Sequence, residues 1–498
     1  MVRVGIRGLS AHDADIVEQL LHALRPDEIR IIGIAILLKH RLSSGALVLA
    51  PSRRHIQMAT LLQRQGRALR VFGGQSRRSS CTQQCRTGSR ARAIAAQSME
   101  EERNRSGVLP AAEPSPMHWK ALNITDAPPD AMPSRRQVLE VLPQHVFESH
   151  TPTSLKYLAI SLSLTAACAF AGTFIPLAPA FIPLWLAYSA VTGTVATGLW
   201  VLAHECGHGA FSKNRRLQTA VGYVLHSAML VPYFSWQRSH AVHHAFTNHL
   251  SAGETHVPYR AGEKSGDANL GMKDKLGEAG YGIVQLIFHF ILGWPAYLLV
   301  GASGGPVRGI TNHFWPTKPF SKALWPGKWK QKVWRSDIGV AITAASLIIW
   351  AVAVGSPWPA IAMYGGPLTI INCWLVGYTW LQHTDTDVPH LEEGNWSWVR
   401  GAFLSIDRPY GPVFDFLHHK IGSTHVAHHI DGTIPHYKAG EATEIIKDNF
   451  PSLYLYDPTP VHKALWRVAR KCAAVEQRSN RWVFVENNQQ VLQRQQQH

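Results

Sequence analysis

Charged side chains are scarce in this sequence. Asp, Glu, Lys and Arg together make up 16% of the 498 residues, whereas apolar residues make up 46%. This is a low charge content for a soluble enzyme, because charged residues are about a quarter of an average soluble chain. The length allows one large domain or several small ones.

Cysteine is also sparse, and its spacing shows no regular framework. The six cysteines are Cys81, Cys85, Cys168, Cys206, Cys373 and Cys472. Two of them lie inside apolar runs, and the closely spaced pair lacks a second pair at zinc-site spacing. We therefore expect no disulfide scaffold and infer that the protein faces a reducing compartment.

Two cofactor-binding signatures are missing as well. No G-x-G-x-x-G follows a strand pattern, so the sequence shows no flavin or nicotinamide fingerprint. No H-P-G-G stretch is present, so a fused haem-binding domain of that type is not visible in the sequence. The chain also does not begin with a signal peptide.

The formal net charge is +16, and much of it comes from one end of the chain. Residues 1–115 contain 18 Lys and Arg against nine Asp and Glu, with no helical or strand period. Three interpretations of this arm remain open: a disordered segment, an Arg-rich targeting peptide, or an over-extended gene model in which Met99 is an alternative start. A Gln-rich tail at 486–498 is predicted to be disordered. We expect no nucleic-acid partner, because the remaining positive charge lies beside apolar segments.

Residues 116–485 form the predicted membrane domain. Four apolar stretches are about long enough to cross roughly 30 Å of hydrocarbon as helices. They cover residues 158–175, 184–203, 338–354 and 360–381. Two weaker apolar pieces, 221–234 and 282–300, contain His or Pro, and we expect them to lie at the interface or half-inserted. The predicted fold class is an all-α integral membrane protein with about four spans, interfacial helices and a histidine-rich cap.

Charge placement orients these spans. The connections 176–183 and 355–359 carry no charge, whereas 317–335 is rich in Lys. Because positive charge marks the cytosolic side, both termini, residues 204–337 and everything after 381 are predicted to face the cytosol. Four tryptophans fit an interfacial belt on that side: Trp315, Trp325, Trp329 and Trp334.

Three histidine clusters lie beyond the ends of the spans. They occur in "HECGH" (204–208), "HAVHH" (240–244) and "HVAHH" (425–429). Residues three and four apart share a helix face, so each cluster can direct two or three imidazoles at one point. An even number of spans separates the clusters, so they can converge. Eight histidines exceed the four ligands of one zinc and suit two metal ions, although spacing alone does not choose among Zn, Cu, Fe and Ni.

Two other classes of function compete with a di-metal enzyme. H-E-x-x-H is typical of zinc proteases, with His204 and His208 as ligands and Glu205 as base. That hypothesis leaves the other two clusters unexplained. A metal transporter or sensor would carry its histidines within the spans, near the bilayer midplane.

Several longer stretches resemble the membrane-bound fatty acid desaturases, specifically the endoplasmic-reticulum acyl-lipid Δ12/Δ15 branch. They are "HECGHGAFS", "SHAVHHAFTNH", "LQHTDTDVPH", "VRGAFLSIDRPYG" and "HHKIGSTHVAHHIDGTIPHYKAGEAT". The resemblance covers about residues 118–485. It implies a non-haem di-iron centre that uses O₂ as co-substrate to remove two hydrogens from an acyl chain. It also implies residence in the endoplasmic-reticulum membrane.

The resemblance also implies the ligands of the two Fe ions. They are His204, His208, His240, His243, His244, His383, His425, His428 and His429. His418 and His419 are weaker candidates that can line the site. Each imidazole needs a partner for its other ring nitrogen, and Glu205, Asn248, Asp385, Asp387 and Asp407 are available.

The remaining expectations concern substrate and partners. The substrate is a fatty acyl lipid, linked to a phospholipid or to CoA, in a narrow apolar tunnel between the spans. Electrons are expected from a separate cytochrome b5 and its reductase, for which the basic segment 317–335 is a candidate docking site. "THVAHH" resembles Δ12 enzymes acting on oleate, whereas "HHKIGSTH" resembles ω-3 enzymes. A Δ15/ω-3 desaturase, a hydroxylase and an enzyme making acetylenic or conjugated bonds therefore remain alternatives.

Overall fold

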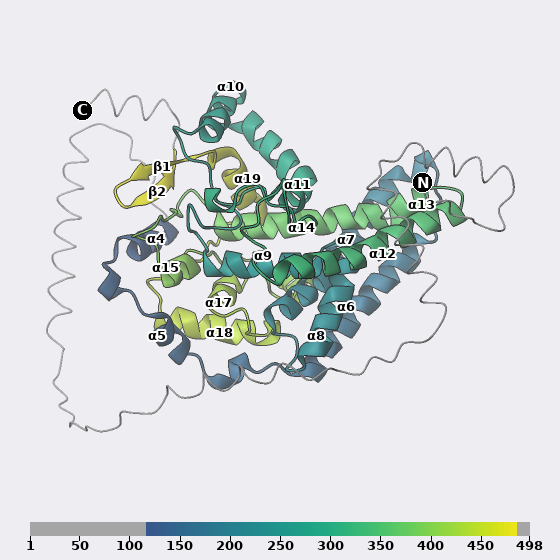
Figure 1. The fold of residues 1–498 in the computed structure, drawn as a ribbon, viewed down its shortest axis with the longest axis horizontal. Coiled ribbons are helices and arrows are strands. Elements are labelled where there is room, and N and C mark those ends of the chain that lie inside the picture. Colours follow the sequence, from purple (N-terminus) through teal and green to yellow (C-terminus); the bar gives the residue numbers. More distant parts are fainter. Residues whose placement is uncertain (1–115, 486–498) are drawn as a thin grey trace, which may run out of the picture. The chain divides into compact units, whose positions relative to one another are not determined.

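The computed structural model describes residues 116–485 (Figure 1). The N-terminal arm (1–115) and the Gln-rich tail (486–498) lie outside the described residues, so their interpretations stay predictions. The helices of the first half are α4 (Pro116–Asp126), α5 (Arg135–Glu140), α6 (Thr151–Gly172), α7 (Ile182–His208), α8 (Arg215–Ala228), α9 (Tyr233–Ala245), α10 (Lys264–Ile287) and α11 (Trp294–Val300). Those of the second half are α12 (Trp329–Ala353), α13 (Trp358–Ala360), α14 (Gly366–His383), α15 (Trp398–Phe403), α16 (Pro412–Leu417), α17 (His425–Ile430), α18 (His436–Asn449) and α19 (Val461–Lys471).

The described residues contain five helices that are long and apolar enough to cross a membrane. Four of them overlap the four predicted spans, two of which were predicted to end one to three residues too late. The protein is an all-α integral membrane protein apart from one small hairpin. The fifth runs from Lys264 to Val300 and includes the weaker piece 282–300. The sequence analysis missed its length because the polar first half of α10 hides the continuity of the helix.

The fifth helix is broken rather than straight. Gly277 has φ 68° and ψ 167°, which is not helical, and a π-helical turn covers Phe288–Gly293. His243, before this helix, and His383, two helices after it, have their Nε2 atoms 3.1 Å apart. An even number of crossings must separate them, so one of the three intervening candidate helices does not cross. The breaks make Lys264–Val300 the segment that we expect not to cross, and its placement at the interface or half-inserted stays a prediction.

Helix α7 is the centre of the membrane half. It packs against α6, α8 and α14, and these long helices lie side by side in Figure 1. Gly193 and Gly198 permit this, because a Cβ atom at either position would collide with backbone or side-chain atoms of the neighbouring segments. Gly209 ends α7 in a left-handed conformation with φ 89°, directly after His208. The helix therefore delivers its last turn, and two histidines, to the edge of the membrane half.

The other half is a cap of short helices, and it holds its own apolar core. Helices α15, α17 and α18 meet there, as Figure 1 shows at the end away from α13. Fully buried members of the core include Phe403, Leu404, Val426, Ala427 and Ile446. A two-stranded antiparallel hairpin, β1 (Val475–Arg478) and β2 (Arg481–Phe484), is the one departure from the all-α prediction within residues 116–485.

The predicted tryptophan belt is only partly correct. Trp315 and Trp334 are exposed, and their rings stack edge to face with centroids 5.0 Å apart. Trp325 instead is buried at 3% exposure among Val242, Leu324 and Val333. In the sequence it lies close to the start of a span, as a belt residue does. The packing of the loop nevertheless places its side chain in an apolar core.

Candidate metal centre and acyl cavity

Five histidines converge at the end of α7. His204 and His208 come from the last turns of α7, His240 and His244 from α9, and His428 from α17. One ring nitrogen of each lies within 4.8 Å of those of the other four. The Nε2 atom of His204 is 2.9 Å from that of His240 and 3.3 Å from that of His208. This set is called the first group below.

A second group lies beside the first. His243 from α9, His383 at the end of α14 and His429 from α17 bring one nitrogen each within 4.8 Å of the others. His425 adjoins them, because its Nε2 atom is 2.9 Å from the Nε2 atom of His383. The structure therefore brings together all nine histidines that the sequence analysis selected, divided five and four. That they bind metal stays a prediction.

The histidines of α9 and α17 are held neutral. Burial lowers the pKa of His243 to about 4, and it lowers the pKa values of His240 and His428 well below the ordinary value for histidine. Neighbouring imidazoles lower these last two pKa values further, because positive charges at such distances repel. Neutral imidazole is the form that binds a metal ion, so the groups are prepared for metal without losing protons.

The donor set fits two ions of the kind that imidazole binds. Imidazole nitrogens lie about 2.0–2.1 Å from zinc and similar ions, so ligand atoms around one ion are within about 4–5 Å of one another. The five nitrogens of the first group meet this condition, and so do those of His243, His383 and His429 in the second group. In addition, Nε2 of His428 and Nε2 of His429 are buried and have no hydrogen-bond partner among the described residues, as expected for atoms that a metal would occupy.

Two threonines hold the outer ring nitrogens of the second group. The hydroxyl of Thr255 lies 3.0 Å from Nδ1 of His243, and that of Thr247 lies 3.0 Å from Nδ1 of His429. Such contacts fix the orientation of a ligating ring. The sequence analysis missed both residues. Thr247 lies just past the end of α9 and contacts a ring 182 residues further along the chain, and nothing local connects Thr255 to His243.

The acidic residues proposed for this role have other partners. Glu205 points away from the histidine groups and accepts a hydrogen bond from the backbone N–H of His436, while its second oxygen lies 2.7 Å from Nδ1 of His436. The prediction that Glu205 holds a ligating imidazole is therefore not what the contacts show. Both carboxylate oxygens are engaged, so Glu205 is not placed as the base of a zinc protease either.

Asp407 and Asp385 support the backbone around the ligands rather than their rings. Asp407 accepts the N–H of Val426 at 2.9 Å and the hydroxyl of Tyr454 at 2.7 Å, which holds the start of α17. Burial raises the pKa of Asp407 to about 7. Asp385 pairs with the buried guanidinium of Arg408 at 2.8 Å, and Arg408 also donates to the carbonyl of Leu381. Arg408 thereby clamps the chain on both sides of His383.

His418 and His419 lie outside both groups. His418 contacts the Tyr378 hydroxyl at 2.8 Å and the carbonyl of Thr194 at 2.7 Å. His419 lies 3.2 Å from the Ser161 hydroxyl. These contacts tie the segment after α16 to the membrane helices, which explains why two adjacent buried histidines resemble ligands in sequence without joining the cluster.

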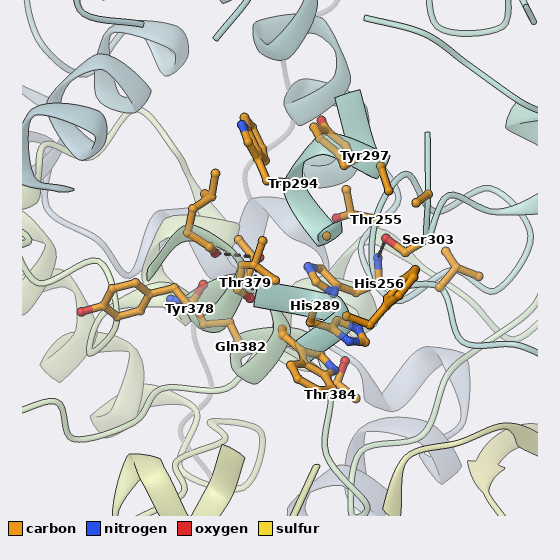
Figure 2. A pocket seen from close by; sticks show the side chains of 18 of the residues that line it. Thr255, His256, His289, Trp294, Tyr297, Ser303, Tyr378, Thr379, Gln382 and Thr384 are labelled. Carbon is orange, nitrogen blue, oxygen red and sulfur yellow. Dashed lines mark hydrogen bonds between the residues drawn. The ribbon is translucent and has the colours of Figure 1, made fainter. Parts of the chain in front are cut away.

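A cavity of about 510 Å³ opens beside the histidines. His204, His240, His243 and His425 form part of its wall, and apolar residues such as Trp200 and Leu375 form much of the remainder. Figure 2 shows how Trp294 and Tyr297 lie on one side, with His256 and His289 across from them. The broken helix Lys264–Val300 supplies Trp294, Tyr297 and His289, which the sequence analysis did not assign to the tunnel. The cavity has the size and lining of a site for an apolar small molecule.

The chain belongs to the fatty acid desaturase family. The sequence model of that family matches residues 179–459, which include every histidine of both groups. The protein is therefore an oxidoreductase of the desaturase type, and most of the residues that line the cavity lie within the matched region.

Curated relatives agree on the class. The Δ12-acyl-lipid desaturase of Punica granatum is 39% identical over 345 residues, covering 68% of this chain and 86% of the relative. An endoplasmic-reticulum ω-6 fatty acid desaturase of Glycine max is 39% identical over 342 residues, covering 68% and 86%. The oleoyl-12-hydroxylase of Ricinus communis is 38% identical over 338 residues, covering 67% and 84%.

Proposed function

We propose that this protein is an O₂-dependent di-iron desaturase that converts oleoyl lipid to linoleoyl lipid by Δ12 desaturation. The observation that carries the proposal is the position of two histidine groups, one half-buried and one buried, at the wall of an apolar cavity. Metal ions held by these histidines would lie beside an apolar chain in the cavity rather than beside a peptide or a solvated ligand.

The two irons would be held by the two groups. The first group supplies His204, His208, His240, His244 and His428, and the second supplies His243, His383, His425 and His429. When bound, the irons supply the activation of O₂ that breaks an unactivated methylene C–H bond. The protein's own residues bind and orient the chain: the aromatic walls exclude water, and Thr247 and Thr255 keep the rings of His429 and His243 in place.

Regiochemistry rests on likeness to relatives. Two of the relatives above are named Δ12 or ω-6 desaturases, and Ala427 within "THVAHH" resembles that branch. The Ricinus communis relative is named a hydroxylase at nearly the same identity. Hydroxylation at the same carbon is therefore the second candidate, and Δ15/ω-3 desaturation is the third.

The proposed location is the endoplasmic-reticulum membrane, with the histidines and both termini in the cytosol and cytochrome b5 with its reductase as electron source. The basic segment 317–335 supports this arrangement. Its Lys318, Lys322, Lys328 and Lys330 side chains are exposed. An acidic donor would be steered toward such a surface, so electron transfer should weaken as salt is raised.

The test is a fatty-acid profile in a eukaryotic host that makes oleate but no dienes. We expect new linoleate with the wild-type chain and none with His243→Ala. His462→Ala is the matched control, because His462 is exposed on α19 and lies outside both groups. Protein amount is measured for all three.

Other products would redirect the proposal. A hydroxylated oleate would place the enzyme with the hydroxylases, and a triene formed only from added linoleate would move it to the ω-3 branch. No new lipid from either substrate, with stable protein present, would contradict the proposal. A content of one zinc per chain would favour the protease hypothesis instead.

A further inference from the structure

A buried polar cluster adjoins the cavity and has no part in holding the histidine groups. It contains Glu254, Ser239, Tyr297 and His313, and all four side chains are at most 8% exposed. The Ser239 hydroxyl is in hydrogen-bond contact with a Glu254 carboxyl oxygen, lies 2.6 Å from the Tyr297 hydroxyl and lies 3.0 Å from Nε2 of His313. One hydroxyl therefore has three hydrogen-bonding neighbours.

The number of protons in this cluster can be counted. Nδ1 of His313 faces the carbonyl of Leu298 at 3.3 Å, so that nitrogen carries a proton. In a neutral ring Nε2 is then an acceptor, and Ser239 must donate its only proton to it. The contact between Ser239 and Glu254 consequently lacks a proton unless Glu254 supplies one.

The three contacts of Ser239 therefore need one proton more than the cluster would have with Glu254 ionised and His313 neutral. That proton resides on Glu254 or on His313. Burial raises the pKa of Glu254 to about 7 and lowers the pKa of His313 to about 4, so the carboxyl group is the favoured site. The half-buried guanidinium of Arg308 faces Glu254 from a neighbouring segment and moderates the rise in its pKa.

The second carboxyl oxygen of Glu254 is unoccupied. Oε2 is buried and has no hydrogen-bond partner within residues 116–485. Glu254 also lines the cavity together with His240 and His243, and its chain neighbour Thr255 bonds the His243 ring. A buried carboxyl oxygen without a partner costs free energy, which favours a function for it.

We propose that Glu254 is a protonated carboxylic acid that delivers protons to O₂-derived oxygen in the cavity, with Ser239, Tyr297 and His313 as its positioning partners. This inference rests on the proposed desaturase function. Formation of one double bond takes two hydrogens from the acyl chain, two electrons from a one-electron donor protein, two protons and one O₂, and it gives two waters. At each delivery the Glu254 O–H bond breaks as a new O–H bond forms on the O₂-derived oxygen, and the carboxylate then regains a proton from water.

The first experiment asks whether Glu254 is protonated, and it does not depend on turnover. Infrared difference spectra are recorded on purified wild type and on Glu254→Gln at pH 6. We expect the wild type to show a carbonyl stretching band of a protonated carboxylic acid that the variant lacks. Glu263→Gln is the control, because it makes the same chemical change on an exposed residue outside the cavity. An identical band in all three proteins would overturn the inference.

The second experiment measures coupling in membranes supplied with reduced donor and oleoyl lipid. For Glu254→Gln we expect about 10²-fold fewer double bonds, the size typical of a lost general acid, with unchanged metal content and KM. Electrons taken from the donor should then appear as hydrogen peroxide. Glu254→Asp should recover part of the turnover, because it restores a carboxylic acid.

Each remaining outcome contradicts the proton-delivery role. Turnover within about twofold of the wild type would show that Glu254 is not needed, and loss of metal from Glu254→Gln would show a structural role. If the wild type formed no double bond at all, the proposed desaturase function would fail, while the infrared band would still decide the protonation of Glu254.

Discussion

The membrane half exposes large apolar side chains, whereas the cap buries charged and polar ones. On the membrane half, large apolar residues face outward: Ile348 is 64% exposed and Val352 is 75% exposed. In the cap, Arg408 and Asp407 are completely buried and His425 is nearly so. Lipid takes the place of a core around the long helices, whereas the cap must satisfy every polar group internally. Polar contacts therefore decide the geometry of the cap, and the predictions below break that contrast in order of expected effect.

The largest effect should come from removing a ligand. His428→Ala removes one ligand nitrogen from the first group, and the methyl group of alanine offers no ligand atom in its place. We expect metal content to fall from two ions per chain to about one, with double-bond formation lost well beyond the 10–100-fold typical of residues that only orient ligands. Metal analysis of purified protein checks this. A variant that keeps two ions and full activity would remove His428 from the proposed ligand set.

Breaking the buried clamp of the cap should be the most costly change in stability. Arg408→Met leaves the buried carboxylates of Asp385 and Asp457 with Arg467 as their remaining cation. We expect a loss of about 3–5 kcal/mol in the free energy of unfolding, because unpaired buried charge is expensive. Unfolding in detergent measures it.

Arg136→Met is the control for this prediction. Arg136 also pairs with a carboxylate, that of Glu140, but the pair is exposed on α5. We expect no shift in its melting temperature. An Arg408→Met protein as stable as this control would show that Arg467 alone satisfies both carboxylates.

Shortening one isoleucine in each half to alanine tests directly whether burial by protein distinguishes the cap from the membrane half. Ile446 on α18 is 0% exposed within the core of the cap, whereas Ile348 on α12 is mostly exposed. Ile446→Ala should cost about 2–5 kcal/mol because it leaves a cavity, and Ile348→Ala should change stability by at most about 0.5 kcal/mol. Equal losses in the two variants would mean that the outer face of α12 is covered by protein rather than by lipid.

The threonine contacts should have a smaller effect, confined to the second group. Thr255→Val and Thr247→Val keep the shape of the side chain but remove the hydroxyl from Nδ1 of His243 and His429. We expect metal affinity at that group to fall about 10–100-fold. Titration with a chelator measures it, with the exposed Thr433→Val as control. Unchanged affinity would mean that packing alone orients the two rings.

The smallest effect concerns pH. Burial lowers the pKa of His226 to about 3, whereas the unfolded chain has the ordinary value near 6.5. The folded state therefore binds fewer protons, so the stability due to this group is complete above pH 6.5 and declines as pH falls toward 3. Glu254 and Asp407 act in the opposite sense, because their pKa values are raised.

A variant isolates the contribution of this histidine. As pH falls from 6.5 to 4.5, the free energy of unfolding of both metal-free proteins should decrease. The decrease in His226→Phe should be smaller than that in the wild type by about 1.4 kcal/mol per pH unit. Thermal unfolding at a series of pH values measures the difference in slope. Parallel curves would show that His226 reaches water before the protein unfolds.

Local spacing made some features predictable. His204 and His208 share a face because they are four residues apart on α7, and the same rule holds for His240 and His244 on α9. The four spans were likewise visible as apolar runs of sufficient length. Trp325 was wrongly placed in the interfacial belt, because the packing of its loop could not be read from the sequence. Glu205 was wrongly matched to a ligating ring, because its partner His436 lies more than 200 residues away along the chain.

The sequence by itself determined the membrane class and the three histidine clusters, because these depend on the length of apolar runs and on short-range spacing. The family, and His383 as a ninth histidine, followed from the resemblance of its motifs. Only the tertiary structure decided how the nine divide between two groups, that the helix Lys264–Val300 is broken and forms a cavity wall, and that Glu254 shares a hydroxyl with His313. These features arise where distant segments pack together. The closing contacts there are set by the fit of whole elements, which no local pattern encodes.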